Sequence, residues 1–171
     1  IIPTYEKIAK IYTQKYFDDK TDYPFVDSFL SYLPPGSKLL DVGCGPGNFT
    51  KYISEKGYDV EGIDLSSEML KIAREKVPNG NFKLMDMRKL SYTNEYFTGL
   101  LAAYSLIHIY SDEVPNTLVE FKRVLKPSGL LGLITQAGEP DRVVDEPMKK
   151  GEKIFDPAKE IFNLSFSVIL C

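Results

Sequence analysis

The chain has 171 residues, 43% of them hydrophobic and 26% charged, and a formal net charge of −3. This length fits one domain, residues 1–171, with a core that buries roughly 70% of the unfolded surface. The charge provides no basic surface for nucleic acid, and no apolar run approaches the ~18 residues that span a membrane. Residues 1–4 have neither the charge nor the apolar core of a signal peptide. Because Cys44 and Cys171 lie far apart without metal-ligand spacing, the sequence favours a reduced, cytoplasmic protein.

Two amphipathic helices are predicted at the start of the chain. Over residues 4–17, aromatic and aliphatic side chains recur at spacings of three and four, which forms one helix face. The tyrosines of this face are Tyr5, Tyr12 and Tyr16. Residues 24–33 predict a second helix, with Pro24 in its first turn and a Pro-Pro-Gly sequence after its end.

Strands and helices then alternate. Apolar segments predict strands at 38–42, 58–64, 81–85, 97–104 and 130–135, and amphipathic segments predict helices at 48–57, 66–76 and 112–125. Gly57 is expected to end the first of these helices, and Ser66 and Ser67 to cap the second. This alternation is typical of a doubly wound α/β fold, in which helices cover both faces of a mostly parallel sheet.

The main motif is the stretch LLDVGCGPGNF at residues 39–49. In an open parallel sheet the ligand binds beyond the carboxyl ends of the strands, where this loop would meet Asp64 and Asp86. Carboxylates at contact distance would repel a pyrophosphate by several kcal/mol. The dinucleotide motif G-x-G-x-x-G also fails, because Asn48 or Thr50 occupies its sixth place. The pattern therefore favours a ligand with hydroxyls, amines and a positive centre.

The sequence resembles a known family at three motifs. They are Asp41-x-Gly43-x-Gly45-x-Gly47, then Gly62-Ile63-Asp64-Leu65-Ser66-x-x-Met69-Leu70, and the helix end at residues 121–129. Together they resemble the class I S-adenosylmethionine-dependent methyltransferases, and among them the small single-domain type 11 group, over roughly residues 4–136. The resemblance implies a Rossmann-like fold, S-adenosylmethionine as cofactor and methyl transfer to a small-molecule acceptor. It also implies a helical lid at residues 1–36 and a cofactor-binding core at residues 37–136.

The resemblance further implies which residues bind the cofactor. Gly43, Cys44 and Gly45 form the loop along its amino-acid and ribose parts, where glycine leaves the backbone bare. Asp41 is expected near the cofactor's ammonium group, directly or through water. Asp64 matches the acid that accepts hydrogen bonds from both ribose hydroxyls.

The remaining expected contacts lie around the adenine and the methionine moiety. Leu65 and Met69 would pack on the adenine faces, and Asp86 would accept a hydrogen bond from the adenine amino group. Met87 would offer its backbone amide to the ring, and Tyr104 would pass its backbone along the methionine moiety. Tyr5, Tyr12 and Tyr16 would form a lid over the cofactor. As structural alternatives, Asp86 can cap a turn, and the tyrosines can pack with exposed hydroxyls.

His108, the single histidine, follows the fourth predicted strand, over the expected methyl-transfer site. A neutral imidazole there can take a proton from the acceptor as a general base, or it can shape the acceptor site. The sequence after this strand has no Asn/Asp-Pro-Pro-aromatic motif, and Ala102-Ala103-Tyr104 stands where metal-dependent relatives carry acids. We therefore expect no metal and a small-molecule acceptor methylated at O, N or C. The alternatives are a non-catalytic S-adenosylmethionine-binding regulator or partner subunit, and an NAD(P)-dependent oxidoreductase.

The C-terminal part, residues 137–171, is expected to be shorter than in relatives, which end in a longer helix and an antiparallel strand pair. Residues 137–153 predict a loop, residues 157–163 a short helix, and residues 165–170 a strand. Either this is a reduced or truncated version of the fold that lacks the last antiparallel strand, or the final strand lies at an exposed edge. An apolar edge invites self-association, so we expect a homodimer or a tendency to aggregate.

Overall fold

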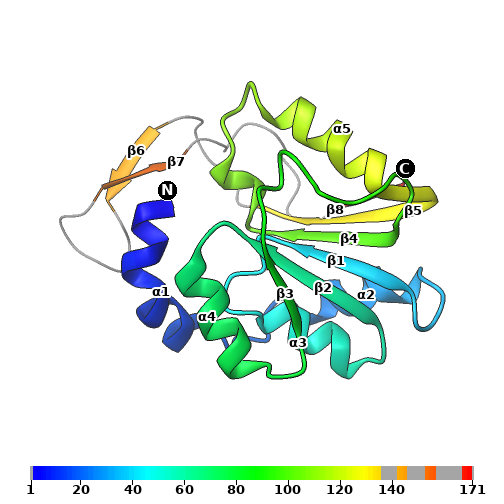
Figure 1. Cartoon of the computed structure of the whole chain (residues 1–171), viewed down its shortest axis with the longest axis horizontal. Coiled ribbons are helices and arrows are strands. Elements are labelled where there is room, and N and C mark those ends of the chain that lie inside the picture. Colours follow the sequence, from blue (N-terminus) through cyan, green and yellow to red (C-terminus); the bar gives the residue numbers. More distant parts are fainter. Residues whose placement is uncertain (1, 136–141, 146–152, 157–166, 171) are drawn as a thin grey trace.

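The computed structural model describes residues 2–135, 142–145, 153–156 and 167–170 (Figure 1). Its main sheet has six strands in the order β3-β2-β1-β4-β5-β8, and the first five of these run parallel. The strands of this sheet are β1 (Lys38–Val42), β2 (Asp59–Asp64), β3 (Asn81–Leu84), β4 (Phe97–Ala103), β5 (Leu125–Ile134) and β8 (Ser167–Leu170). The predicted doubly wound α/β fold is confirmed.

The helices agree with the predicted ones to within a few residues. They are α1 (Ile2–Tyr16), α2 (Tyr23–Ser31), α3 (Asn48–Glu55), α4 (Ser67–Lys76) and α5 (Val114–Val124), with a 3-10 turn, η1 (Leu106–His108), after β4. Ser66 caps α4 as expected, because its Oγ accepts a hydrogen bond from the Met69 N–H at 3.2 Å. No helix in the described part of the chain is long and apolar enough to cross a membrane.

The two faces of the sheet bury separate apolar clusters, because side chains alternate along each strand. On β4, Leu100 and Ala102 pack in the cluster that includes residues of α5. Leu101 and Ala103 point the other way and pack with residues of α2 and α3. Helix α5 and helices α2 and α3 accordingly lie on opposite sides of the sheet (Figure 1). Burial on both faces explains why the β4 sequence is almost entirely apolar.

The structure corrects the prediction in the C-terminal half. Strand β5 begins at Leu125 rather than at residue 130, because Leu125 already pairs with Phe97 before an irregularity shifts the register. Strands β6 (Arg142–Asp145) and β7 (Lys153–Asp156) form an antiparallel pair, where the sequence predicted a loop over residues 137–153. The helix predicted at residues 157–163 lies outside the described residues.

Strand β8 decides between the two alternatives for the end of the sheet. It pairs antiparallel with β5, with Leu130 opposite Leu170, and it stands last in the strand order. The main sheet therefore has an antiparallel edge strand rather than lacking one. The homodimer expected from this edge stays a prediction.

Parallel strands bring their carboxyl ends to one edge of the sheet, and the backbone turns sharply there. Gly43, after β1, has φ +71°, and Tyr104, after β4, has φ +55°. The left-handed region is uncommon for a tyrosine and is often found at functional sites. The sheet thus places the glycine loop, the end of β2 and the segment after β4 around one space.

Candidate functional site

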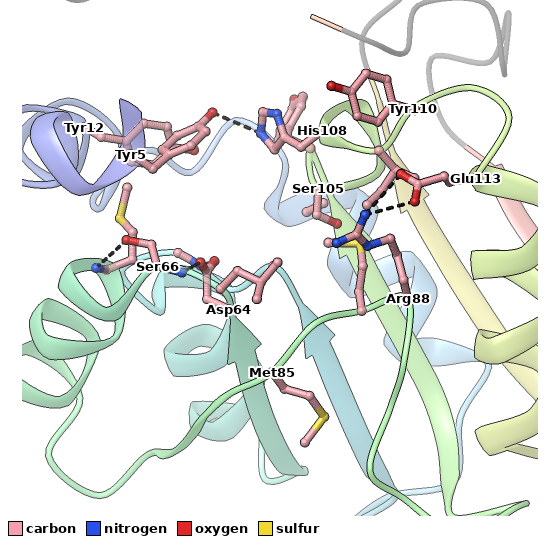
Figure 2. Close-up of a pocket in the computed structure, with 18 residues that line it drawn as sticks. Tyr5, Tyr12, Asp64, Ser66, Met85, Arg88, Ser105, His108, Tyr110 and Glu113 are labelled. Atoms are coloured by element: carbon pink, nitrogen blue, oxygen red, sulfur yellow. Dashed lines mark hydrogen bonds and ion pairs between the residues drawn. The ribbon is translucent and has the colours of Figure 1, made fainter. Parts of the chain in front are cut away.

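A cavity of about 310 Å³ opens at this edge of the sheet (Figure 2). This volume is in the range of small-molecule binding sites. Five segments supply the lining: helix α1, the loop after β1, the junction of β2 with α4, the loop after β3, and the segment from β4 to the start of α5. The cavity therefore combines parts that are far apart in the sequence.

The Asp64 carboxylate, in the cavity lining, is held in place by backbone hydrogen bonds. Its Oδ2 accepts a hydrogen bond from the Gly45 N–H at 2.9 Å, and its Oδ1 accepts one from the Ser66 N–H at 2.8 Å. Each carboxylate oxygen can accept a second hydrogen bond, so two donors on a ligand can still be received. Burial raises the pKa of Asp64, against the lowering effect of the backbone N–H groups. A ligand with two hydroxyls or a positive charge fits this side chain.

The glycine loop gives the ligand a bare backbone surface. A Cβ on Gly43 would overlap the Cβ of Ser105 and lie 3.5 Å from the Met87 methyl carbon, so no side chain fits here. At Gly45, apart from the glycine itself and its two chain neighbours, no heavy atom of the described residues lies within 4 Å of the position that a Cβ would take. The open side of the loop is therefore the Gly45 side, beside Asp64. This bare backbone surface beside an acid with free acceptor positions can receive a ligand that carries hydroxyl groups.

Asp41 lies beneath the loop rather than in the cavity lining. Its side chain is 1% exposed, and its Oδ2 accepts a hydrogen bond from the Thr50 Oγ1 at 2.6 Å. Burial raises the pKa of Asp41 to about 7, and the nearby charge of Asp64 adds to this. Within the described residues neither acid forms an ion pair. A cationic ligand would lower the electrostatic energy of both acids.

Helix α1 contributes an aromatic wall that reaches across to η1. The Tyr5 hydroxyl lies 3.0 Å from the His108 Nε2, and the Tyr5 ring stands edge-on to those of Tyr12 and His108. Tyr12 lines the cavity, and burial raises its pKa to about 12. Desolvation lowers the pKa of His108 to about 4, so the imidazole is neutral at pH 7. This wall carries no charge near neutral pH.

A second contact of helix α1 fixes it to the start of α4, on the Asp64 side of the cavity. Glu6 Oε1 accepts a hydrogen bond from the Ser67 N–H at 2.8 Å and one from the Ser67 Oγ at 3.3 Å. Ser67 is the first residue of α4, where a carboxylate also interacts favourably with the helix dipole. Adjacent residues, Tyr5 and Glu6, thus bind opposite sides of the cavity.

The cavity wall formed by the loop after β3 and the start of α5 holds a cluster of ion pairs around Arg88. The Arg88 guanidinium donates to Asp86 through Nε and one terminal nitrogen, at 2.7 to 3.0 Å, and to Glu113 through the other, at 3.0 and 3.1 Å. Both Arg88 and Glu113 line the cavity. The hydrogen bond from Arg88 lowers the pKa of Asp86. The Asp86 carboxylate is therefore held by Arg88.

The structure brings most of the expected residues together. The expected residues that line the cavity are Tyr5, Tyr12, Gly43, Gly45, Asp64, Leu65, Met69, Met87, Tyr104 and His108. Four expected residues are not part of the lining in the described chain, namely Asp41, Cys44, Asp86 and Tyr16. Cys44 is buried among Leu70, Ala73 and Phe82, and Tyr16 packs on Tyr12 with ring centroids 4.8 Å apart.

Sequence reasoning gave no role to Ser105 and did not identify Arg88 or Glu113. Ser105 directly follows Tyr104, so its place after a strand end was a usable signal. Arg88 and Glu113 are 25 positions apart, and no local pattern links them. Their presence in the lining depends on the fold.

Comparison with known proteins gives consistent matches. The chain matches a family model described as "Methyltransferase domain" over residues 39–129. It is 36% identical over 104 residues to YqeM of Bacillus subtilis, which carries a methyltransferase name, covering 58% of this chain and 42% of that protein. It is 32% identical over 99 residues to the malonyl-[acyl-carrier protein] O-methyltransferase of Salmonella typhimurium, covering 58% and 39%. The chain thus spans about two-fifths of the length of these relatives.

A solved structure agrees in fold over most of the chain. The PH0226 protein from Pyrococcus horikoshii superposes with a TM-score of 0.74 and 23% identity, covering 91% of this chain and 84% of that protein. At this identity the likeness concerns the fold.

Proposed function

The chain belongs to the class I S-adenosylmethionine-dependent methyltransferases, and from this membership we propose that it transfers a methyl group from S-adenosylmethionine to a small-molecule acceptor. One observation carries most of the proposal. The partly buried Asp64 carboxylate, held by two backbone N–H groups, lies beside an open glycine loop in a cavity of suitable size. These residues fit a ligand that combines a ribose diol, a positive centre and an amino-acid end.

The residues divide the cavity into two parts. Asp64 would accept the ribose hydroxyls, while Leu65 and Met69 would contact the adenine. Tyr5 and Tyr12 would exclude water from the reacting atoms, which supports displacement by a nucleophile. When bound, the cofactor supplies an electrophilic methyl group on its sulfonium centre. The part bounded by His108, Tyr110 and Glu113 would receive the acceptor.

His108 is poorly suited to hold a proton taken from the acceptor. Its pKa of about 4 lies well below neutral pH, and its Nε2 already lies 3.0 Å from the Tyr5 hydroxyl. General bases act best when their pKa lies near the working pH. We therefore propose that His108 orients Tyr5, in place of the general-base role that its position in the sequence suggested. The acceptor would then be a group with a free lone pair at neutral pH, such as a carboxylate oxygen.

The proposal is tested in two steps. Titration calorimetry with S-adenosylmethionine, S-adenosylhomocysteine and NADH first identifies the cofactor, and we expect the two adenosyl compounds to bind. Incubation with S-adenosylmethionine labelled in its methyl group and separate pools of carboxylic acids, amines and phenols then identifies the acceptor. We expect label to enter the carboxylic acids first.

Other outcomes favour the alternatives. Tight NADH binding without binding of either adenosyl compound would refute the proposal in favour of an oxidoreductase. Binding of S-adenosylmethionine without transfer to any pool would favour the non-catalytic regulator or partner subunit.

A further inference from the structure

Ser105 is a buried residue whose hydroxyl has no partner. It lines the cavity immediately after Tyr104 and is 3% exposed. Among the buried side-chain oxygens and nitrogens of the described residues, the Ser105 Oγ alone lacks a hydrogen bond. Figure 2 shows Ser105 on the cavity side of β4, between His108 and Arg88. Because an unbonded buried hydroxyl is unfavourable, we expect a ligand atom to supply its partner.

The glycine loop indicates which part of the ligand this is. A Cβ on Gly43 would lie 3.4 Å from the Ser105 Oγ, so Ser105 stands at the Gly43 end of the loop. Asp64 stands at the other end, because it accepts the Gly45 N–H. With the ribose at Asp64, a cofactor lying along the loop would place its amino-acid end near Gly43 and Ser105.

We propose that the Ser105 hydroxyl donates a hydrogen bond to the carboxylate of the cofactor's amino-acid end, an inference that rests on the proposed function. The Asp64 carboxylate would repel a ligand carboxylate at the Gly45 end of the loop, whereas a hydroxyl donor at the Gly43 end stabilises one. Rotation about the Cα–Cβ bond moves a serine hydroxyl between staggered positions without backbone movement, so Ser105 can turn towards the ligand.

The test compares two ligands and two variants of the full chain by titration calorimetry. The ligands are S-adenosylhomocysteine and its decarboxylated analogue, which keeps the ammonium group. For Ser105→Ala we expect S-adenosylhomocysteine to bind about tenfold more weakly, and the analogue to change by less than about twofold. Ser37→Ala is the matched control, because Ser37 is also buried but its Oγ donates to the Pro34 carbonyl at 2.6 Å, before β1.

Urea unfolding of the unliganded variants gives a second readout. Ser37→Ala should lower the midpoint, because a hydrogen bond is lost, and leave both affinities unchanged. Ser105→Ala should not lower the midpoint, because the hydroxyl has no bond to lose. Equal weakening of both ligands by Ser105→Ala, or unchanged binding of S-adenosylhomocysteine, would overturn the inference. If the wild-type chain binds neither ligand, the proposed function fails and the inference fails with it.

Discussion

Replacing Gly43 with alanine adds one methyl group to the loop after β1, and the structure divides its cost into two parts. Gly43 has φ +71°, where an L side chain costs about 1–2 kcal/mol. The new Cβ would also overlap the Ser105 Cβ, and overpacking of this kind costs about 1–3 kcal/mol. We expect the free energy of unfolding to fall by about 2–5 kcal/mol in total.

The variant Gly36→Ala separates the backbone cost from the overpacking cost. Gly36 has the same φ of +71°, but apart from the glycine itself and its two chain neighbours no heavy atom of the described chain lies within 4 Å of the position that a Cβ would take. It should therefore lose only the backbone part, about 1–2 kcal/mol. Urea unfolding followed by circular dichroism measures both variants, with unchanged m-values expected. The double variant Gly43→Ala/Ser105→Gly should be more stable than Gly43→Ala alone. Equal losses in the two alanine variants would refute the reasoning.

Three further predictions concern carboxylates. Asp64→Asn should weaken S-adenosylmethionine binding about 10- to 100-fold in calorimetry, because a charged acceptor is lost. Asp59→Asn, at the exposed start of the same strand, should leave that affinity unchanged. Because the folded-state pKa of Asp41 is raised from 3.8 to about 7, its contribution to stability should fall as pH rises through this window. Asp41→Asn should therefore gain stability relative to wild type between pH 4 and 8 in urea unfolding, and a pH-independent difference would contradict this. Glu6→Ala should cost about 1 kcal/mol and speed amide exchange in α1, because its bonds to Ser67 are lost; unaltered exchange would show that they do not hold the helix.

The order of strands and helices was predictable because each core strand is a short run of residues buried on both faces. The β4 sequence FTGLLAA is an example. The start of β5 was not predictable in the same way. Its residues Lys126-Pro127-Ser128-Gly129 have the composition of a turn, and they join the strand because Leu125 pairs with Phe97 on β4. Tertiary pairing overrides local propensity there.

The same distinction between local sequence and tertiary pairing applies to the residues of the site. Gly43 and Asp64 were predictable because their roles depend on position at a strand end. The place of Asp41 depends on Thr50, nine residues later, which bonds the carboxylate beneath the loop. The engagement of Asp86 depends on Arg88, which in turn reaches Glu113 near the start of α5. Side-chain pairing across the fold decides which acids remain available to a ligand.

Helix α1 has a consequence for the speed of ligand exchange. It contacts both sides of the cavity through neighbouring residues, Tyr5 on His108 and Glu6 on Ser67. If each contact contributes about 1 kcal/mol, the two together make the open state of α1 about 30-fold rarer than it would be if neither contact existed. Under the proposed function, the helix that would shield the reacting atoms would also slow the release of spent cofactor. We therefore expect the opening of α1, rather than chemistry, to limit turnover.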